Sequence, residues 1–454
     1  MNNLLFLLLS WPVVGFVVYS VVFSNRTQSV GLPLAYLVGF ALLHWPGAAL
    51  YLDEGYFYYQ PDIVLSGFRL TTYGLWAFCL GIIVMRLLDN KQFTGSVVVA
   101  KKFPHAYAGE IKKMAIVFVG IGLFAQLIVI PLMGPIATVT ALVSGLSSLS
   151  IVGVCLGLWD AMLVRDRRLF IKWLLLAFSF PLITLMHSAF LGFGVAKLIA
   201  IIAFVSSFKR ARLKHVVLML IIAYLGLSLF VTYFRDRTEL RNLVWTQGAD
   251  YSERIDHIWG MFQNFELFDP DNDIHLFAID ERLNQNHLIG RAINYINMGG
   301  AEYAKGKTIW FAFVALIPRA VWPDKPAVGG GGSMVSDYTG IIFAQGTSVG
   351  SGQVFEFYIN FGVIGVVIGF FVFGIIITLF DGRAAMALVS GDYRLFVMWF
   401  LPGIGLLQAG GNLVELVTTV GAAIGSALVA IVIIRRYLRK PVSIKLREAV
   451  KRGF

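Results

Sequence analysis

Long apolar runs recur along the whole chain and constrain its fold more than any other feature. Eleven of them approach or exceed about 18 residues, the length at which a helix crosses the hydrocarbon core of a bilayer. Of the 454 residues, 58% are hydrophobic and 14% are charged. We therefore expect an all-α polytopic membrane protein with about 11 transmembrane helices. The predicted spans are Leu4 to Phe23, Val30 to Leu52, Leu70 to Leu88, Met114 to Met133, Ala141 to Val164, Leu169 to His187, Phe190 to Phe208, Val216 to Phe234, Val354 to Phe380, Tyr393 to Ala409 and Leu413 to Ile434.

The run from Tyr393 to Ala409 is the weakest of these predicted spans. It is short and contains Pro402, Gly403 and Gly405, which disfavour a regular helix interior. If this run did not cross the membrane, every later segment would lie on the opposite side.

The basic residues indicate how the bundle is oriented. Lys and Arg gather in every second connection, among them Arg86, Lys101 and Arg165, and such residues are retained on the cytoplasmic side. The N-terminus is then outside and the C-terminus is cytoplasmic. The first run lacks the positively charged start of a cleaved signal peptide, so we interpret it as the first span. The predicted division is 1–234 with helices 1–8, a large outer loop 235–353, 354–434 with helices 9–11, and a basic tail 435–454.

The outer loop differs from the rest of the chain in charge. It contains ten Lys and Arg against fourteen Asp and Glu, whereas the whole chain has a net charge of +11. The excess positive charge therefore lies in the cytoplasmic connections, where topology and anionic membrane lipid explain it, and we expect no nucleic acid partner. Aromatic and charged residues alternate at helical spacing from Ser252 to Phe268 and from Ile279 to Met298, which predicts helices on or near the outer membrane surface.

Two further segments of the loop are unusual. The apolar run from Thr308 to Val321 is too short to cross, so we expect it to re-enter the membrane or to lie flat. The tetraglycine from Gly329 to Gly332 predicts either a hinge near a substrate groove or a plain flexible linker.

The sequence predicts no metal site and no cofactor. Asp269 to Asp280 resembles a calcium loop, but Ile274 stands where the sharp turn needs glycine, so an Asx turn capping a helix is favoured over a divalent ion. The histidines are scattered without ligand-like pairing. Cys79 and Cys155 both lie in apolar runs, where they act as small hydrophobes.

Arginine is the more informative basic residue of the outer loop, with seven copies against three lysines. Its guanidinium group grips phosphate oxygens through paired hydrogen bonds and keeps its charge. The alternative is that these arginines pair with the carboxylates of the loop. We single out Arg282, Arg291 and Arg319 as candidates for an anion. The first two are nine residues apart, two and a half helical turns, and share a face only if the helix breaks.

Two charged residues fall within apolar runs. Glu356 enters the ninth predicted span, where a desolvated carboxylate suits proton transfer. It is equally explained as an acid that complements a helix N-terminus. Lys197 is the basic residue deepest in an apolar run and is a functional hypothesis by default, with snorkelling to the interface as the alternative.

Four motifs together resemble the Wzy-type oligosaccharide repeat-unit polymerases of bacteria. These are IPRAVWPDKP (317–326), TSVGSGQVFEFYINFG (347–362), ERLNQN (281–286) and YAKGKT (303–308). The resemblance covers the motifs between about Asp280 and Gly365, and the remainder only in hydropathy.

The resemblance implies a GT-C-like helical fold in the bacterial inner membrane that uses sugars carried on undecaprenyl diphosphate. The growing chain would be transferred to a second lipid-linked repeat unit at the outer face, without nucleotide or metal. Partners implied are undecaprenyl-diphosphate-linked oligosaccharides, membrane lipid and a chain-length-regulating copolymerase. The roles that follow are diphosphate binding by Arg282, Arg319 and Lys325 with support from Arg291, proton transfer by Glu356 or His287, and further substrate contacts by Trp322, Tyr358 and Asn360. An O-antigen ligase and a lipid-linked oligosaccharide transporter or flippase are the alternatives.

Overall fold

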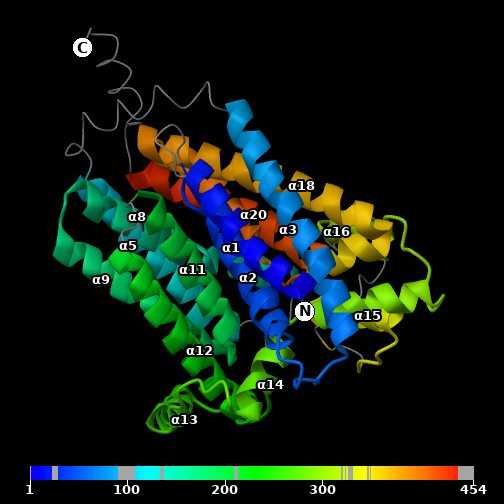
Figure 1. The fold of residues 1–454 in the computed structure, drawn as a ribbon. Helices are drawn as coiled ribbons and strands as arrows, with labels where there is room; N and C mark the ends of the chain where they lie inside the picture. The colour runs from blue at the N-terminus through cyan, green and yellow to red at the C-terminus, as the bar shows by residue number, and fades with distance from the viewer. Residues whose placement is uncertain are drawn as a thin grey trace.

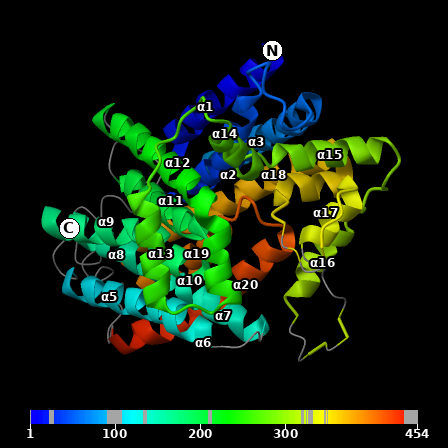
Figure 2. The same ribbon diagram turned by 90° about the horizontal axis from the view of Figure 1, so that it is seen from below.

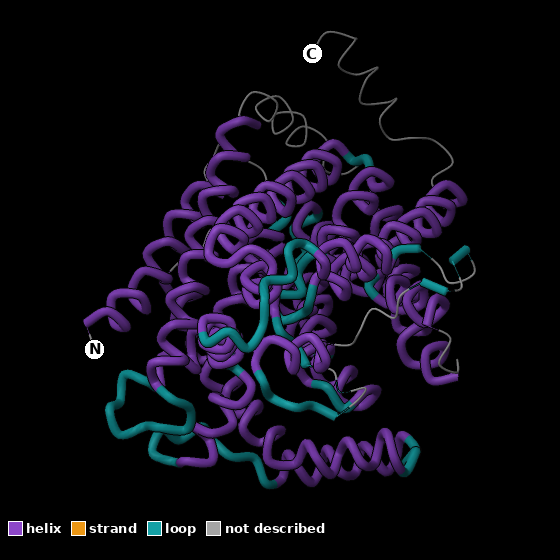
Figure 3. Tube along the Cα trace, turned by 90° about the vertical axis from the view of Figure 1, so that its right-hand side faces the viewer, coloured by secondary structure: helices purple, strands orange, loops and turns teal. Residues whose placement is uncertain are grey.

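A computed structural model describes residues 2–22, 29–89, 108–132, 137–208, 213–317, 321–322, 324–325, 331–344, 347 and 349–437. All regular secondary structure in these ranges is helical (Figure 3). The segments predicted to span the membrane contain α1 (Asn2–Val22), α2 (Leu32–Leu50), α3 (Pro61–Asp89), α5 (Ala108–Phe124), η1 (Ala125–Val129), α6 (Ile130–Leu132), α7 (Ala137–Ser147), α8 (Leu149–Leu163), α9 (Arg167–Phe178), α10 (Phe180–Ser188), α11 (Leu191–Phe208), α12 (Leu213–Arg241), α18 (Gly352–Ser390), α19 (Tyr393–Gly405) and α20 (Leu413–Tyr437). The segment predicted as the outer loop, called the outer-loop region below, contains η2 (Asn242–Thr246), α13 (Tyr251–Gln263), α14 (Asp273–Arg282), α15 (Asn286–Asn297), α16 (Lys307–Ala315) and α17 (Gly331–Thr339).

The structure confirms the all-helical fold for the described residues and is compatible with a helical membrane protein. Nine segments of the described residues are helical, long and apolar enough to cross a bilayer, and they coincide with nine of the predicted spans. The other two predicted spans fall on α12 and α19. With 13 residues, α19 is only about 20 Å long, shorter than the hydrocarbon core. The count of about 11 crossings therefore stays a prediction.

The last three helices, α18, α19 and α20, alternate in direction. The N–H of Gly352 donates to the carbonyl of Gly410 (3.1 Å), and the N–H of Leu413 donates to Glu356 Oε2 (2.6 Å). These bonds bring together the start of α18, the loop after α19 and the start of α20. Segment 393–411 thus returns the chain to the end of the bundle where α18 began, even though its helix is short.

A buried ion pair joins three helices at the opposite end of the bundle. Arg86 of α3 bonds Asp381 of α18, and both side chains are almost fully buried. The other carboxylate oxygen of Asp381 accepts the N–H groups of Val30 (3.1 Å) and Leu32 (3.0 Å) at the start of α2. Arg86 is therefore part of the packed bundle rather than of a cytoplasmic connection.

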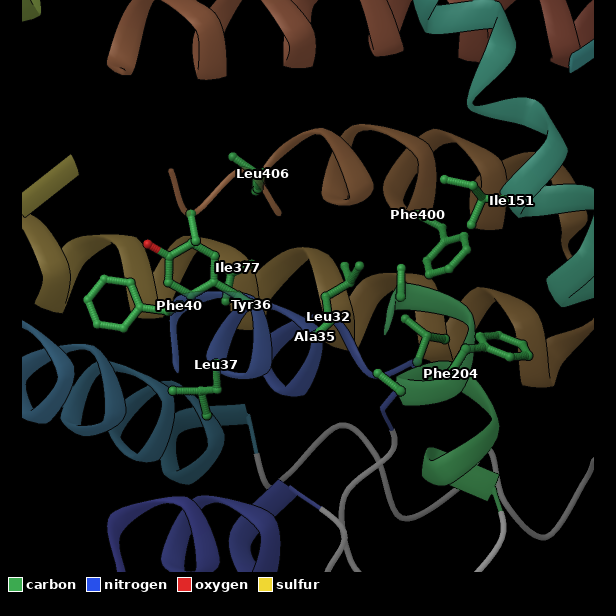
Figure 4. Close-up of a cluster of buried hydrophobic side chains, with 14 of the residues drawn as sticks. Leu32, Ala35, Tyr36, Leu37, Phe40, Ile151, Phe204, Ile377, Phe400 and Leu406 are labelled. Atoms are coloured by element: carbon green, nitrogen blue, oxygen red, sulfur yellow. The ribbon is translucent and has the colours of Figure 1, made fainter. Parts of the chain in front are cut away.

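Aromatic packing extends from this ion pair along α2, α3 and α18. Tyr36 packs against Phe78 and Phe373, and Phe40 packs against Phe370. Figure 4 shows Tyr36 and Phe40 between α2 and the neighbouring helices, with Ile377 behind them. Since these side chains are fully buried or nearly so, they form the centre of the core.

The helix α18 is bent near its start. Phe361 and Gly362 leave helical geometry, and Gly362 has a φ of 63°, which glycine adopts without steric cost. The first turns, 352–360, are thereby set apart from the long apolar part of the helix.

The helices of the outer-loop region gather at the end of the bundle where α1 starts (Figures 1 and 2). On α13, the side chains of Tyr251, Ile255 and Trp259 repeat every fourth residue and are all exposed, with Trp259 64% exposed. This amphipathic pattern agrees with the surface helix predicted from 252 to 268. The α16 helix occupies part of the short apolar run and has only nine residues.

We expect the Arg86–Asp381 pair to be required for a stable bundle. Removing one member of a buried ion pair leaves the other charge uncompensated, which costs about 3–5 kcal/mol. Arg86→Met should therefore sharply reduce the folded fraction in thermal-stability measurements by size-exclusion chromatography in detergent. Arg383→Met, two residues beyond Asp381 on α18, is the matched control. Equal stability of the two variants would contradict the prediction.

Candidate functional site

The segment from Asp280 to Arg291 docks tightly onto α2 and α3. The helix breaks after Arg282, and α15 starts at Asn286. In the break, the N–H of Gln285 donates to the carbonyl of Leu43 (3.0 Å), and the N–H of Gly47 donates to the carbonyl of Leu283 (3.2 Å). A side chain at Gly47 would collide with Asn284, so this close approach requires glycine.

Asp280 anchors this segment through three donors. It is completely buried and accepts hydrogen bonds from Tyr51 Oη (2.7 Å), Tyr56 Oη (3.1 Å) and Asn284 Nδ2 (2.5 Å). Burial raises the pKa of the Asp280 carboxyl, and the three donors oppose that effect. The acidic run from 269 to 280 therefore ends in a structural network. Its start forms an Asx turn, and Asn272 caps α14 as predicted.

Asn286 continues the same network into the bundle. Its Nδ2 donates to the carbonyl of His44 (2.8 Å) and to Asn284 Oδ1 (2.8 Å). Its Oδ1 lies 3.0 Å from His44 Nδ1 and accepts from Thr71 Oγ1 (3.2 Å). The two asparagines of ERLNQN thus hold the outer segment on the ends of α2 and α3.

His287 is presented by this rigid segment. Its ring stacks on Tyr59, with centroids 4.1 Å apart and planes 5° apart. Nδ1 lies 2.7 Å from the carbonyl of Asn284, which can only accept, so the neutral ring is protonated at Nδ1 and Nε2 holds a lone pair. Burial lowers the pKa of His287 to about 4. The residue is therefore neutral at physiological pH and able to accept a proton.

Two arginines gather around Arg282, which stands on the same docked segment as His287 and interacts with Tyr59, the stacking partner of that histidine. Arg237 and Arg241 are one turn apart on α12. The positive charge of Arg237 is repelled by those of Arg282 and Arg241, and the charge of Arg282 is also repelled by that of Arg241. Arg237 lies over the ring of Phe234 (4.3 Å), and Arg241 lies over that of Phe190 (4.8 Å). These side chains form what we call the arginine cluster: Arg237, Arg241 and Arg282. Like charges held together on apolar rings favour an anion between them.

The carboxylates of the loop neutralise only some of its arginines. Arg235 pairs with Asp236 (2.7 Å) and with Glu266, as expected if the arginines of the loop pair with its carboxylates. In contrast, Arg282 is 3.8 Å from Glu281, a long contact for an ion pair. Among the described residues, Arg237 and Arg241 have no carboxylate within 4.0 Å.

A second group of predicted residues surrounds the start of α18. Asn360 Oδ1 accepts the N–H of Gly306 (2.9 Å), and its Nδ2 donates to Thr308 Oγ1 (2.7 Å) and to the carbonyl of Glu356 (2.7 Å). Tyr303 lies edge-on to Tyr358. The structure thus brings YAKGKT into direct contact with the start of FEFYINFG, two motifs more than forty residues apart in sequence.

Glu356 lies within this second group and is 1% exposed. Its Oε2 accepts the N–H of Leu413 at the start of α20, and the Thr308 hydroxyl also bonds the carboxylate. The residue therefore complements a helix N-terminus, but that helix is α20 and not its own.

The remaining candidates are spread over several elements. Lys325 donates from Nζ to the carbonyls of Ala315 (3.1 Å) and Ile317 (2.7 Å), which caps α16. Trp322 is 39% exposed. Arg291 is exposed on α15, and its charge acts on His287. Arg319 lies outside the described residues.

One glutamine connects the segment that carries Arg282 and His287 to the group at the start of α18. Gln285 immediately precedes α15, the helix of His287. Its Nε2 donates to the carbonyl of Gly350 (3.1 Å), just before α18. At the start of that helix, Gln353 accepts from Tyr36 Oη (2.9 Å) and donates to the carbonyl of Gln408 (2.6 Å). The arginine cluster and the start of α18 therefore belong to one polar region at the same end of the bundle.

Comparison with protein families identifies a match over residues 75–442 to the family described as Domain of unknown function (DUF8712). The chain belongs to this family. No curated protein and no solved structure matches the chain.

The sequence does not single out Arg237, Arg241, Tyr59 or Asp280 as functional residues. Arg237 and Arg241 have the four-residue spacing of one helix face, but that signal needs α12 to continue past the predicted end at Phe234. Nothing in the sequence indicates that Tyr59 stacks on a residue more than two hundred positions away.

We expect Asn360→Leu to release the YAKGKT segment from α18. The change leaves the Gly306 N–H and the Thr308 hydroxyl without this partner, at a cost of about 1–3 kcal/mol for each buried group. Hydrogen exchange followed by mass spectrometry should show faster exchange in 303–308, with α3 unchanged. Asn297→Leu at the end of α15 is the control. Unchanged exchange in 303–308 would show that Asn360 does not hold the segment.

We expect His287 to make stability depend on pH. Between about pH 6.5 and about pH 4, the unfolded chain binds a proton on this residue and the folded chain does not, so stability falls as the pH falls through that window. The contribution at about pH 5 is at most about 2 kcal/mol. His287→Phe keeps the ring stack and should lose less stability than wild type between about pH 7.5 and about pH 5 in thermal unfolding. Equal losses would contradict the assignment.

Proposed function

We propose that this protein is a glycosyl-transferring polymerase. It joins oligosaccharide repeat units carried on undecaprenyl diphosphate into a polysaccharide and releases undecaprenyl diphosphate. The observation that carries the proposal is the arginine cluster, whose Arg282 stands on the same docked segment as the stacked, neutral His287. This segment combines permanent positive charge with a proton acceptor, which a reaction with a diphosphate leaving group needs.

In this proposal the arginine cluster binds the diphosphate of the donor. Breaking the bond between the sugar carbon and the diphosphate oxygen leaves negative charge on that oxygen. Guanidinium groups stabilise developing charge at fixed positions, so neither nucleotide nor metal is required by the proposed step. The contacts of Arg237 and Arg241 with aromatic rings hold their side chains in place.

The acceptor hydroxyl would lose its proton to His287. A new bond forms between the acceptor oxygen and the sugar carbon, the diphosphate leaves with the bonding electrons, and the proton passes to Nε2. His287 is neutral at physiological pH and is supported from behind by the Asn284 carbonyl. Glu356 is the second candidate base in this proposal, with one oxygen already occupied by the N–H of Leu413.

The proposed setting is the outer face of the bacterial inner membrane, with the N-terminus outside and the C-terminus cytoplasmic. In support, α13, α14 and α15 lie at the end of the bundle where α1 starts (Figure 1). Trp322, Tyr358 and Asn360 would line the sugar path, with Arg291, Arg319 and Lys325 as further basic groups near the diphosphate. A chain-length-regulating copolymerase is the proposed protein partner.

Two alternatives use the same substrates. An O-antigen ligase would take the same donor to a different acceptor, and the arginine cluster suits both. A lipid-linked oligosaccharide transporter would place charged groups along its spans. Apart from the Arg86–Asp381 pair, the polar networks described above gather around residues 280–308 and the start of α18, which favours an enzyme over a transporter.

The test is a polymerisation assay with purified full-length protein and synthetic lipid-diphosphate repeat units, with chelator and without nucleotide. We expect Arg282→Ala to reduce kcat by about 100- to 1,000-fold, the range for losing one donor to a developing anion. Arg69→Ala, an exposed arginine of α3, is the matched control. Transfer to a lipid A core acceptor alone would indicate the ligase. Directional lipid movement in vesicles without any glycosyl transfer would indicate the transporter.

A further inference from the structure

A second basic site lies where α5 gives way to a π-helix. The π-helix η1 contains Gln126, which is 4% exposed. Its Oε1 accepts a hydrogen bond from Lys197 Nζ (2.7 Å) on α11. The same ammonium group lies 5.4 Å from the centre of the Phe180 ring. Inserted π-turns frequently mark functional sites.

The partners of Lys197 carry no full negative charge. An ammonium group has three donors, and the amide of Gln126 occupies one of them. Among the described residues, no carboxylate lies within ion-pair distance of Lys197. A cation within a membrane span normally pairs with a charge, a backbone carbonyl or water, so Lys197 is incompletely neutralised.

Two further basic side chains converge on the same place. His187, at the end of α10, has a buried Nδ1 without a hydrogen-bond partner in the described structure. The charges of both Lys197 and Arg254 act on it. Arg254 of α13 is fixed there because its Nη1 donates to the carbonyl of Met186 (3.1 Å) and its Nε to that of Ala249 (2.9 Å). The nearby carboxylate is that of Asp250, which already caps α13.

The surface helix α13 is attached at this point. Tyr251 Oη donates to the carbonyl of Leu127 (3.0 Å) within the π-helix, and Arg254 lies over the Tyr251 ring (5.2 Å). Apolar side chains border the site on the outside. Phe193, one turn before Lys197 on α11, is 61% exposed, and Leu182 of α10 is also exposed. Both lie on candidate membrane spans.

We propose that Lys197, His187 and Arg254 bind the phosphate group of an anionic lipid, with an acyl chain against Phe193 and Leu182. A phosphate offers acceptors to all three donors and supplies the missing negative charge. A free anion would satisfy the donors but would leave the exposed apolar border uncovered, which favours a lipid as the source. The lipid would connect α13 to the π-helix and to the tip between α10 and α11. This site uses none of the residues proposed for glycosyl transfer, although Phe193 packs against Phe190, over which Arg241 lies.

The test uses full-length protein in detergent, titrated with phosphatidylglycerol or phosphatidylcholine and observed by native mass spectrometry. We expect wild type to bind a first phosphatidylglycerol more tightly than phosphatidylcholine. Lys197→Met should weaken that first binding about tenfold, the effect of losing about 1.4 kcal/mol, and Lys197→Arg should restore most of it. Lys172→Met, an exposed lysine of α9, is the matched control and should bind like wild type.

A second variant keeps the proposal testable if Lys197→Met does not fold. His187→Leu removes a ring whose Nδ1 makes no hydrogen bond in the described structure, and it should also weaken phosphatidylglycerol binding. Equal binding by wild type, Lys197→Met and His187→Leu would overturn the site. Binding of inorganic pyrophosphate that depends on Lys197, without preference for phosphatidylglycerol, would overturn the lipid as its source.

Discussion

The ion pair between Arg86 and Asp381 is the contact on which the arrangement of the bundle depends. It lies where water is absent, so each charge needs its partner, and Asp381 also holds the first N–H groups of α2. One carboxylate thus sets the relative positions of α2, α3 and α18. These three helices carry the aromatic core, and their other ends carry the surface on which the outer segment docks.

That outer segment is held by a different kind of contact. Backbone bonds from Gly47 and Gln285, together with the buried Asp280, let the chain lie directly on α2 and α3. Because Gly47 has no side chain, the outer segment can lie directly against α2. The hydrogen bonds of Asp280 then satisfy the polar groups that this contact buries. His287 follows immediately, so its orientation derives from a rigid support. A side chain intended for chemistry benefits from such a support, because misplacement weakens catalysis.

The polar region at this end of the bundle combines parts from distant segments. Arg237 and Arg241 come from the extension of α12, His287 from α15, and Glu356 and Asn360 from the start of α18. Gln285, just before α15, connects this helix to the start of α18 through its bond to the carbonyl of Gly350. The Lys197 site is built on α10, α11 and η1 and is attached to α13. It adjoins the arginine cluster, because Phe193 packs against Phe190, over which Arg241 lies.

The sequence by itself determined the class of fold and the positions of nine spans, since run length and hydropathy are local properties. It also indicated Glu356 and Asn360 as special, because polar residues that enter an apolar run need partners, whereas ERLNQN and YAKGKT were indicated only by the resemblance of their motifs. Only the tertiary structure decided what those partners are. Arg86 meets Asp381, Asn360 meets Gly306, and the arginine cluster forms around Arg282 through contacts between distant segments, which no local pattern specifies.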